Sequence, residues 1–312
     1  MAGSDIARAS DDASFRRYFR LLGGDKSFIA MDAPPDRENS QPFIQVTGFL
    51  EAMELNAPRV IEADLEQGFL LLTDLGTDQY LDRLTADPDS AAPLYDDAIG
   101  ALLAMQSKGS AYQEQLPPYD EKLLRFELSL FHDWLCGRHL ELELSDDDEA
   151  AWRELCDLLV DNALSQPKVF VHRDYHSRNL MVMETNNPGI LDFQDAVEGP
   201  LTYDLVSLLK DCYIRWPAER VREWALDFNA QLASPVDEIQ FMRWFELMGV
   251  QRHIKAAGIF CRLNHRDGKA RYLDDVPQTV RYITELAPRY PELSFIASLI
   301  DERVLPNWGD SQ

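Results

Sequence analysis

The stretch from Val169 to Asp195 limits the fold of this chain more than any other, because polar and apolar residues follow one another there in short, ordered runs. An apolar run at 168–171 predicts a short strand, and it leads into His172-Arg173-Asp174. A polar loop then continues to Asn179. The first half of the stretch therefore predicts that a strand delivers one carboxylate and one carboxamide into a single loop.

The second half of the stretch predicts a β-hairpin. Residues 180–183 and 189–191 are apolar, and the turn-forming residues 184–188 separate them. The second strand ends in Asp192-Phe193-Gln194, so its carboxylate is expected at the same edge as the polar loop.

These three polar side chains suit phosphoryl transfer, which depends on positioning and charge neutralisation rather than on covalent chemistry. Asp174 is the candidate to accept the proton of an attacking hydroxyl, and Asn179 and Asp192 offer the hard oxygen ligands that Mg2+ prefers. The order His-Arg-Asp-x-x-x-x-Asn followed by Asp-Phe-Gln matches the kinase signature except at its last glycine. The alternative, a surface loop in which Asp174 caps a turn, leaves the ordered spacing and the second carboxylate unexplained.

Composition predicts a folded, cytoplasmic protein. The chain has 312 residues, of which 46% are hydrophobic, and this is enough for a large core in two lobes. No charged and apolar leader and no apolar run of bilayer length are evident, so neither export nor membrane insertion is expected. A net charge of -24 argues against a nucleic-acid partner. The four cysteines lack metal-binding spacing and are expected to be reduced.

Hydrophobic periodicity predicts an α+β arrangement with a small sheet lobe at 1–76 and a larger helical lobe at 77–312. In the first lobe, residues 14–31 predict a hairpin, 42–55 a helix, and 58–63 and 68–73 two strands. In the second, helical patterns cover 80–84, 91–106, 119–136, 147–165, 202–213, 218–231, 236–262, 276–286 and 291–300. The lobes are expected to join at a hinge near 73–76.

The small polar segment from Ser10 to Ser14 precedes the predicted hairpin. Its backbone N–H groups, with Ser14 at the end, are candidates to bind phosphate oxygens although the usual glycines are missing. An ordinary turn explains the segment equally well, and the sequence leaves both interpretations open.

The motifs together resemble the aminoglycoside phosphotransferase and choline kinase superfamily, and the resemblance spans nearly the whole chain. It is carried by Val171 to Asn179, by Leu191 to Asp195 and by the following Gly199-Pro200-Leu201-Thr202-Tyr203-Asp204-Leu205-Val206. Residues 12–19, 31–35, 192–196 and 251–255 are similar to one subgroup, the anomeric sugar kinases of bacterial cell-wall recycling. The resemblance implies a protein-kinase-like two-lobe fold with a small antiparallel-sheet lobe and a larger helical lobe.

The resemblance also implies roles for individual residues. Asp174 corresponds to the catalytic base, and Asn179 and Asp192 to the magnesium ligands. The hinge that meets adenine with its backbone corresponds to Thr73, Asp74 and Leu75. Structural support of the catalytic loop is expected from the remaining polar positions, His172, His176 and Asp204.

Met31 departs from the superfamily pattern, because it stands where a strand lysine normally contacts the nucleotide phosphates. A thioether does not neutralise phosphate charge. Either Arg17 or Arg20 from the hairpin is expected to substitute for the lysine, or metal and backbone hold the phosphates alone.

The segment from Gln251 to Arg271 is strongly basic for this acidic chain, with six Lys or Arg residues and one acid. Arg252 or His253 is a candidate to pair with the lactyl carboxylate of N-acetylmuramic acid. The alternative is a helix whose basic face pairs with carboxylates of the protein. Asp195 is a candidate for substrate binding or metal binding, or it caps the exit from the hairpin.

The leading hypothesis is an ATP-dependent, magnesium-requiring kinase that phosphorylates the anomeric hydroxyl of N-acetylmuramic acid and N-acetylglucosamine. One alternative is a kinase for an amine such as an aminoglycoside, choline or homoserine. Another is a kinase-like protein that binds nucleotide without turnover, which Met31 favours and the retained Asp174, Asn179 and Asp192 oppose. No obligate protein partner is evident.

Overall fold

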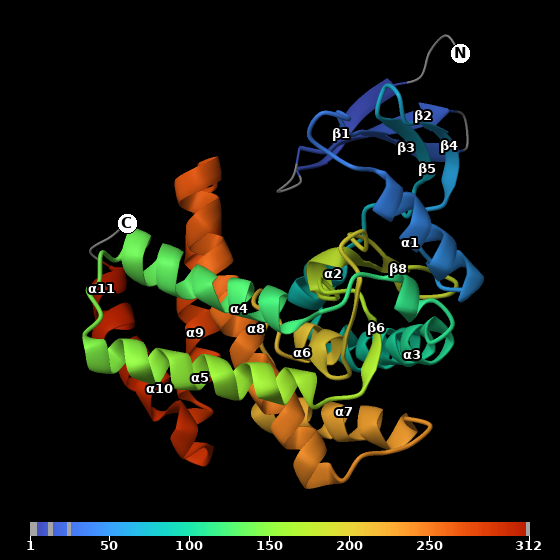
Figure 1. Ribbon diagram of the computed structural model, residues 1–312. Coiled ribbons are helices and arrows are strands. Elements are labelled where there is room, and N and C mark those ends of the chain that lie inside the picture. The colour runs from blue at the N-terminus through green and yellow to red at the C-terminus, as the bar shows by residue number, and fades with distance from the viewer. Residues whose placement is uncertain (1–4, 12–14, 24–25, 310–312) are drawn as a thin grey trace. The chain divides into compact units, whose positions relative to one another are not determined.

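The computed structural model describes residues 5–11, 15–23 and 26–309. The chain divides into two compact units (Figure 1). Unit 1 comprises residues 1–116 and 172–197, and unit 2 comprises residues 117–171 and 198–312. The predicted catalytic stretch therefore lies almost entirely within unit 1.

Unit 1 begins with a five-stranded antiparallel sheet in the order β1-β2-β3-β5-β4, which is drawn in blue in Figure 1. Its strands are β1 (Asp5–Asp11), β2 (Arg17–Gly23), β3 (Lys26–Asp32), β4 (Val60–Asp64) and β5 (Phe69–Thr73). The hairpin β2-β3 and the strands β4 and β5 confirm the sequence prediction. The strand β1 was not predicted, and it pairs along the outer edge of β2.

The rest of unit 1 is helical apart from one short hairpin. The helices are α1 (Gln41–Ala52), α2 (Tyr80–Ala86) and α3 (Ala91–Gly109), with short 3-10 turns η1 (Pro88–Ser90), η2 (Gln113–Gln115) and η4 (Ser177–Asn179). The hairpin consists of β7 (Leu180–Met181) and β8 (Gly189–Ile190), which pair antiparallel as predicted. The chain passes directly from η4 into β7, so the polar loop and the hairpin form one continuous structure.

One face of the large sheet is the apolar face. Met31 on β3 lies opposite Leu70 on β5 and opposite Tyr18 on β2, and residues directly opposite in an antiparallel pair share a face. Met31, Leu70 and Leu72 are buried. Burial of Leu70 and Leu72 accounts for the apolar residues on this face of β5, whereas β4 at the sheet edge is mostly exposed.

Unit 2 is built around the long helix α8 (Glu238–Asp267), against which α4, α5, α6, α7 and α9 pack. The bounds of the other elements are α4 (Glu121–Leu130), η3 (Phe131–His139), α5 (Asp146–Leu164), β6 (Lys168–Val171), β9 (Val197–Pro200), α6 (Tyr203–Leu209), α7 (Ala218–Gln231), η5 (Ala270–Asp275), α9 (Val276–Thr284), η6 (Ala287–Arg289), η7 (Pro291–Leu293), α10 (Ser294–Leu299), η8 (Ile300–Val304) and α11 (Leu305–Trp308). The strands β6 and β9 form a two-stranded sheet.

The predicted helix over 119–136 is interrupted at Leu130, where α4 passes into a π-helical segment, η3. At this junction Gly258 of α8 lies against the backbone, and a Cβ on Gly258 would come within 2.3 Å of the Leu130 carbonyl carbon. Such an approach is open to glycine alone, so it fixes how α8 lies against α4.

A small antiparallel-sheet lobe and a larger helical lobe are therefore present, as the sequence predicted, and the fold is α+β. The boundary between lobes at residues 76 and 77 stays a prediction. Within the described ranges, no helix combines the length and apolar character needed to cross a membrane.

We expect Met31→Lys to destabilise the protein rather than to restore a phosphate contact. Met31 has 0% exposure, and a buried ammonium without a partner costs at least about 3 kcal/mol. Met31→Leu, which keeps apolar volume, serves as the matched control and should cost less than about 1.5 kcal/mol. Thermal melting compares the two variants, and equal melting temperatures for Met31→Lys and the wild type would contradict the assignment of Met31 to the core.

Candidate active site

The polar loop of the catalytic stretch is held together by the amide group of Asn179. Its Nδ2 donates to the backbone oxygen of Asp174 at 3.0 Å and to Oδ2 of Asp192 at 3.3 Å. The backbone N–H of Leu191 donates to the backbone oxygen of Asn179 at 2.9 Å, which adds a bond between the loop and the residue that precedes Asp192. The structure thus brings together the three residues predicted to carry the chemistry.

Asp192 follows directly after the hairpin, and its backbone is in the left-handed region with φ 63°. This conformation turns the chain sharply, and Gln194 Nε2 donates to Asp192 Oδ1 at 2.8 Å. Phe193 is buried and packs against Phe43 of α1 with ring centroids 4.9 Å apart. The two carboxylate oxygens of Asp192 therefore accept from two amides while its neighbour is anchored in the core.

His172 contacts the backbone of the loop. It is fully buried, and its Nδ1 accepts a bond from the backbone N–H of Asp174 at 3.2 Å. Burial lowers the pKa of His172 to about 4, although the charge of Asp174 opposes this shift. The imidazole is therefore neutral at pH 7 and can act as an acceptor. Tyr175 is also buried, and its hydroxyl donates to the Ala98 oxygen of α3 at 2.8 Å.

His176 and Asp195 occupy different environments. His176 is buried, and its backbone N–H donates to the backbone oxygen of Asp174 at 3.0 Å. Its supporting role in the loop stays a prediction. Asp195 is exposed, and its backbone oxygen accepts from Arg173 at 3.4 Å. The left-handed backbone of Arg173, with φ 78°, sharpens the turn just before Asp174.

The predicted hinge is clamped by Arg20 of β2. Arg20 Nε donates to Asp74 Oδ2 at 2.6 Å, its Nη2 donates to Oδ1 at 3.0 Å, and Nη2 also donates to the Gly76 oxygen at 2.7 Å. Burial alone would raise the pKa of Asp74, but the bonds from Arg20 and from the Gly76 N–H outweigh it, and the pKa is lowered. The Asp74 side chain is thus used inside the protein as a charged brace for the hinge.

The other two hinge residues differ in their side-chain contacts. Thr73 ends β5, and its Oγ1 accepts from the Arg59 N–H at 2.9 Å, so the side chain fixes the start of β4. Leu75 lies beside the hairpin, since a Cβ on Gly189 would approach its Cδ1 to 2.9 Å. The side chains of Thr73 and Leu75 thus make contacts within the protein. Recognition of adenine by the hinge backbone stays a prediction.

The hairpin arginines are each paired with a carboxylate. Arg17 is paired with Asp32 and is exposed. Arg16, which the sequence reasoning did not single out, pairs through Nη2 with Glu38 Oε2 at 3.1 Å. In the structure, side-chain exposure alternates at the start of β2, and Arg16 lies on the more buried face. Ser14 lies outside the described residues.

Three predicted residues belong to unit 2, where all are buried. Asp204 is on α6, and Arg252 and His253 are on α8. Arg252 Nε donates to Ser207 Oγ at 2.6 Å, and His253 Nε2 lies 2.9 Å from the Lys210 oxygen. Burial lowers the pKa of His253 well below its usual value. Their predicted contact with an acceptor stays a prediction.

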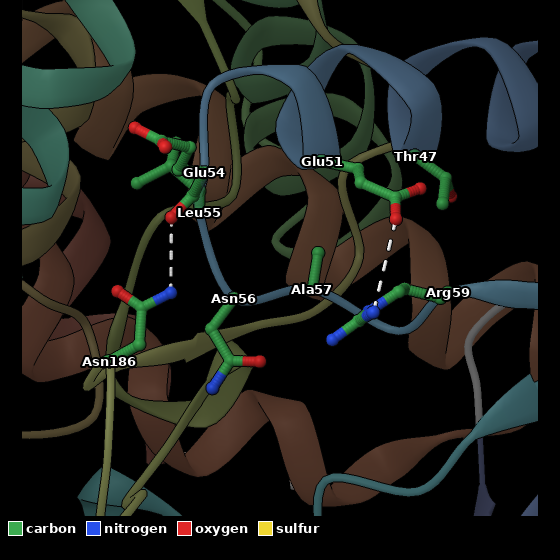
Figure 2. A pocket seen from close by; sticks show the side chains of 8 residues that line it. All are labelled: Thr47, Glu51, Glu54, Leu55, Asn56, Ala57, Arg59 and Asn186. Atoms are coloured by element: carbon green, nitrogen blue, oxygen red, sulfur yellow. Dashed lines mark hydrogen bonds and ion pairs between the residues drawn. The ribbon is translucent and has the colours of Figure 1, made fainter.

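A separate polar pocket of about 280 Å3 lies at the end of α1 in unit 1 (Figure 2). In Figure 2, Arg59 faces Glu51 at 3.9 Å, and Asn186 donates to the Glu54 oxygen at 3.0 Å. The lining residues are Thr47, Glu51, Glu54, Leu55, Asn56, Ala57, Arg59 and Asn186. None of the predicted catalytic or metal-binding residues is among them.

The comparison with known proteins places this arrangement in a family. The sequence profile of the phosphotransferase enzyme family matches residues 5–245. The chain therefore belongs to the phosphotransferase enzyme family.

Curated proteins similar to the chain carry a more particular name. The chain is 50% identical over 302 residues to an N-acetylmuramate/N-acetylglucosamine kinase of Pseudomonas aeruginosa, covering 95% of this chain and 88% of that protein. It is 41% identical over 308 residues to a protein of the same name from Neisseria meningitidis serogroup B, covering 96% of this chain and 91% of that protein.

Solved structures show the same fold at low sequence identity. An ethanolamine kinase of Plasmodium vivax is 11% identical with a TM-score of 0.64, covering 93% of this chain and 83% of that one. A GDP complex of aminoglycoside 2'-phosphotransferase-IIIa is 15% identical with a TM-score of 0.61, covering 88% of this chain and 92% of that one. These structures confirm the protein-kinase-like fold.

We expect His172 to make stability fall as the pH is lowered from 7 to 5. The folded state keeps His172 neutral until about pH 4, whereas the unfolded chain protonates it near its ordinary pKa. The unfolded state then binds more protons, so it is favoured by about 2 kcal/mol at pH 5. Chemical denaturation at both pH values tests this. His172→Gln, which has no such titration, should lose less stability over this range, and an unchanged pH dependence would contradict the role of His172.

Proposed function

We propose that the protein transfers the γ-phosphoryl group of ATP to the anomeric hydroxyl of N-acetylmuramic acid and N-acetylglucosamine. The observation that carries the proposal is the 50% identity, over 95% of this chain, to a protein with that kinase name. The geometry around Asp174 supplies the chemical support, since the Asn179 amide bonds both the backbone of Asp174 and the carboxylate of Asp192, which follows β8.

In the proposed reaction, Asp174 orients the sugar hydroxyl and accepts its proton. The oxygen of the hydroxyl forms a bond to the γ-phosphorus while the bond between that phosphorus and the β–γ bridging oxygen breaks, and ADP leaves with the bridging oxygen. The backbone of Asp174 is fixed on both sides, by Nδ2 of Asn179 at its oxygen and by the neutral ring of His172 at its N–H. The carboxylate is thus presented from a backbone that does not need to rearrange during the reaction.

Asn179 and Asp192 are the residues proposed to hold Mg2+ with the phosphates. Both offer oxygen atoms, and the Asn179 amide is oriented because its nitrogen donates to Asp174 and Asp192. Mg2+ commonly binds through one or two carboxylates together with substrate phosphates and water, so this donor set fits. Among the residues the structure describes, no group of three or more His, Cys, Asp or Glu side chains forms a metal site, and the proposed site does not need one. When bound, the ion would neutralise charge that develops on the phosphates.

The cytoplasm is the proposed location, because the reaction consumes ATP and because the cysteines behave as reduced core residues. Cys136, Cys156, Cys212 and Cys261 are all free and buried. Burial raises the pKa of the Cys136 thiol to about 12, which keeps it protonated and unreactive.

A panel of acceptors tests the proposal. ADP release is measured with N-acetylmuramic acid, N-acetylglucosamine, choline and an aminoglycoside, and phosphorus–proton correlation spectra identify the phosphorylated carbon. We expect turnover with the two sugars and phosphate on carbon 1. Turnover with the amines alone would assign the enzyme to the amine kinases, and ATP binding without turnover on any acceptor would favour a regulatory protein.

We expect Asp174→Asn to lower kcat by about 100- to 10,000-fold at saturating sugar, because an amide does not accept the hydroxyl proton. Asp192→Asn should lower kcat comparably and raise the magnesium concentration required, since a charged ligand is lost. Glu184→Gln is a matched control, because it removes one exposed carboxylate from the turn of the same hairpin. Unchanged kcat for Asp174→Asn in a protein with wild-type melting would remove Asp174 from the proposed role.

A further inference from the structure

The polyphosphate of ATP must be neutralised by cations, and strand β3 does not provide one at the usual place. Kinases place a lysine on this strand against the phosphates. Here Met31 occupies the position, and its side chain is fully buried. A neutral, buried thioether gives no charge to a phosphate, so another cation is needed if the protein uses ATP as proposed above.

The sheet register shows which side chains share the face of Met31. Tyr18 of β2 lies directly opposite Met31, and Arg20 lies opposite Ile29. Side chains two residues apart on a strand point to the same face, so Arg16, immediately before β2, continues the row of Tyr18 and Arg20. Exposure follows this alternation, because the Arg16 side chain is 9% exposed and that of Arg17 is 56% exposed.

Arg17 and Arg20 are both less suited to the phosphates than Arg16. Arg17 points to the opposite, exposed face and pairs with Asp32. Arg20 has the right face, but its guanidinium is bound in a fork to Asp74 and to the Gly76 oxygen, at the hinge end of the site. Arg16 instead lies at the other end of β2, immediately before Arg17.

Glu38 fixes both Arg16 and the backbone beside it. One carboxylate oxygen lies 3.1 Å from Arg16 Nη2, and the other accepts the N–H of Phe15 at 3.0 Å. The Glu38 side chain is 12% exposed, so the pair is shielded from solvent and weakly screened. Glu38 is itself placed by the turn after β3, where its N–H donates to the Pro34 oxygen at 2.9 Å. An arginine has five N–H donors in a planar fork, which lets one guanidinium bind a carboxylate and a phosphate together.

We propose that Arg16, positioned by Glu38, is the cation that contacts the phosphates of ATP in place of the strand lysine. In protein kinases, a lysine on β3 contacts the phosphates and forms an ion pair with a glutamate. In this proposal, Arg16 beside β2 takes the place of the lysine, and Glu38 in the turn after β3 takes the place of the glutamate. This inference rests on ATP being the nucleotide of the proposed function, and it adds the residue that binds the phosphates.

Calorimetric titrations of MgATP and of adenosine test the assignment without any acceptor sugar. We expect Arg16→Gln to weaken MgATP binding by about 10- to 100-fold, the range of a lost charge-assisted bond, and to leave adenosine binding unchanged. Arg16→Lys, which keeps the charge, should recover part of the loss. Arg59→Gln is the control for loss of an arginine charge elsewhere in unit 1. Unlike Arg16, Arg59 has an exposed side chain, and it lies 3.9 Å from Glu51. It should bind both ligands as the wild type does.

The part played by Glu38 is tested by a double-mutant cycle. Glu38→Gln should weaken MgATP binding, and it should have no further effect in the Arg16→Gln protein if Glu38 acts only through Arg16. An additional and equal loss in both backgrounds would show that Glu38 acts independently of Arg16 and would overturn its positioning role.

Three results would overturn the assignment of Arg16. They are wild-type MgATP affinity in Arg16→Gln, an equal loss for MgATP and adenosine, and a loss confined to MgATP in Arg17→Gln instead. If Arg16→Gln does not fold, as melting would show, Arg16→Lys and Arg16→Met are compared, and equal MgATP affinity in these two overturns it. Failure of the acceptor panel leaves these titrations unaffected, whereas a wild-type protein that does not bind MgATP would refute the proposed function itself.

Discussion

The amide of Asn179 is the interaction on which the candidate active site depends. A single NH2 group donates to the backbone of the loop that carries Asp174 and to the carboxylate of Asp192. These two partners are separated along the chain by the entire β7-β8 hairpin, so the amide closes the hairpin at its base. Replacing the amide by an apolar group would leave a carbonyl and a carboxylate oxygen without this donor in a partly buried site, which is costly. The same contact orients the amide oxygen, so one side chain both braces the site and presents a ligand atom.

Two further groups, His172 and Asp74, support the loop and the hinge, and each keeps a fixed protonation state near neutral pH. The pKa of His172 is lowered by burial to about 4, and the pKa of Asp74 is lowered by Arg20 despite burial. A neutral imidazole accepts the N–H of Asp174, and an ionised carboxylate anchors the hinge. Because neither brace titrates near neutral pH, the geometry of both the loop and the hinge is insensitive to moderate changes in pH.

Local patterns made much of the fold predictable from the sequence. The hairpin β2-β3, the helix α7 and the short hairpin β7-β8 all follow from periodicity and turn residues, and the sequence reasoning located them correctly. The strand β1 was not predicted, because Asp5–Asp11 contains a single large apolar residue, Ile6, and so lacks the apolar pattern of a strand. It pairs with β2 in the structure. The π-helical segment after Leu130 was also missed, since it coincides with the approach of Gly258 from a distant helix.

The candidate site shows the same division between local and distant contacts. The spacing of Asp174, Asn179 and Asp192 is a local pattern, and the structure brings these residues together. The pair of Arg16 with Glu38 joins a strand end to a turn, and no sequence period links such positions. Likewise, Arg252 and His253 in the basic run were candidates to pair with the lactyl carboxylate, and both are buried on α8. Whether a basic helix residue faces the core depends on which helices surround it.

The presence of Met31 in place of a lysine also determines which covalent affinity labels can react at this position of β3. A lysine amine on the strand is a nucleophile that acyl phosphates and activated esters can modify once a nucleotide analogue delivers them. A thioether forms no stable amide with such reagents, and the complete burial of Met31 also limits the access of oxidants to its sulfur. Affinity labels that depend on an amine at this position of β3 would therefore leave the protein unlabelled. With methionine in place of lysine at this position, a protein that binds nucleotide would still not react with amine-directed nucleotide analogues there.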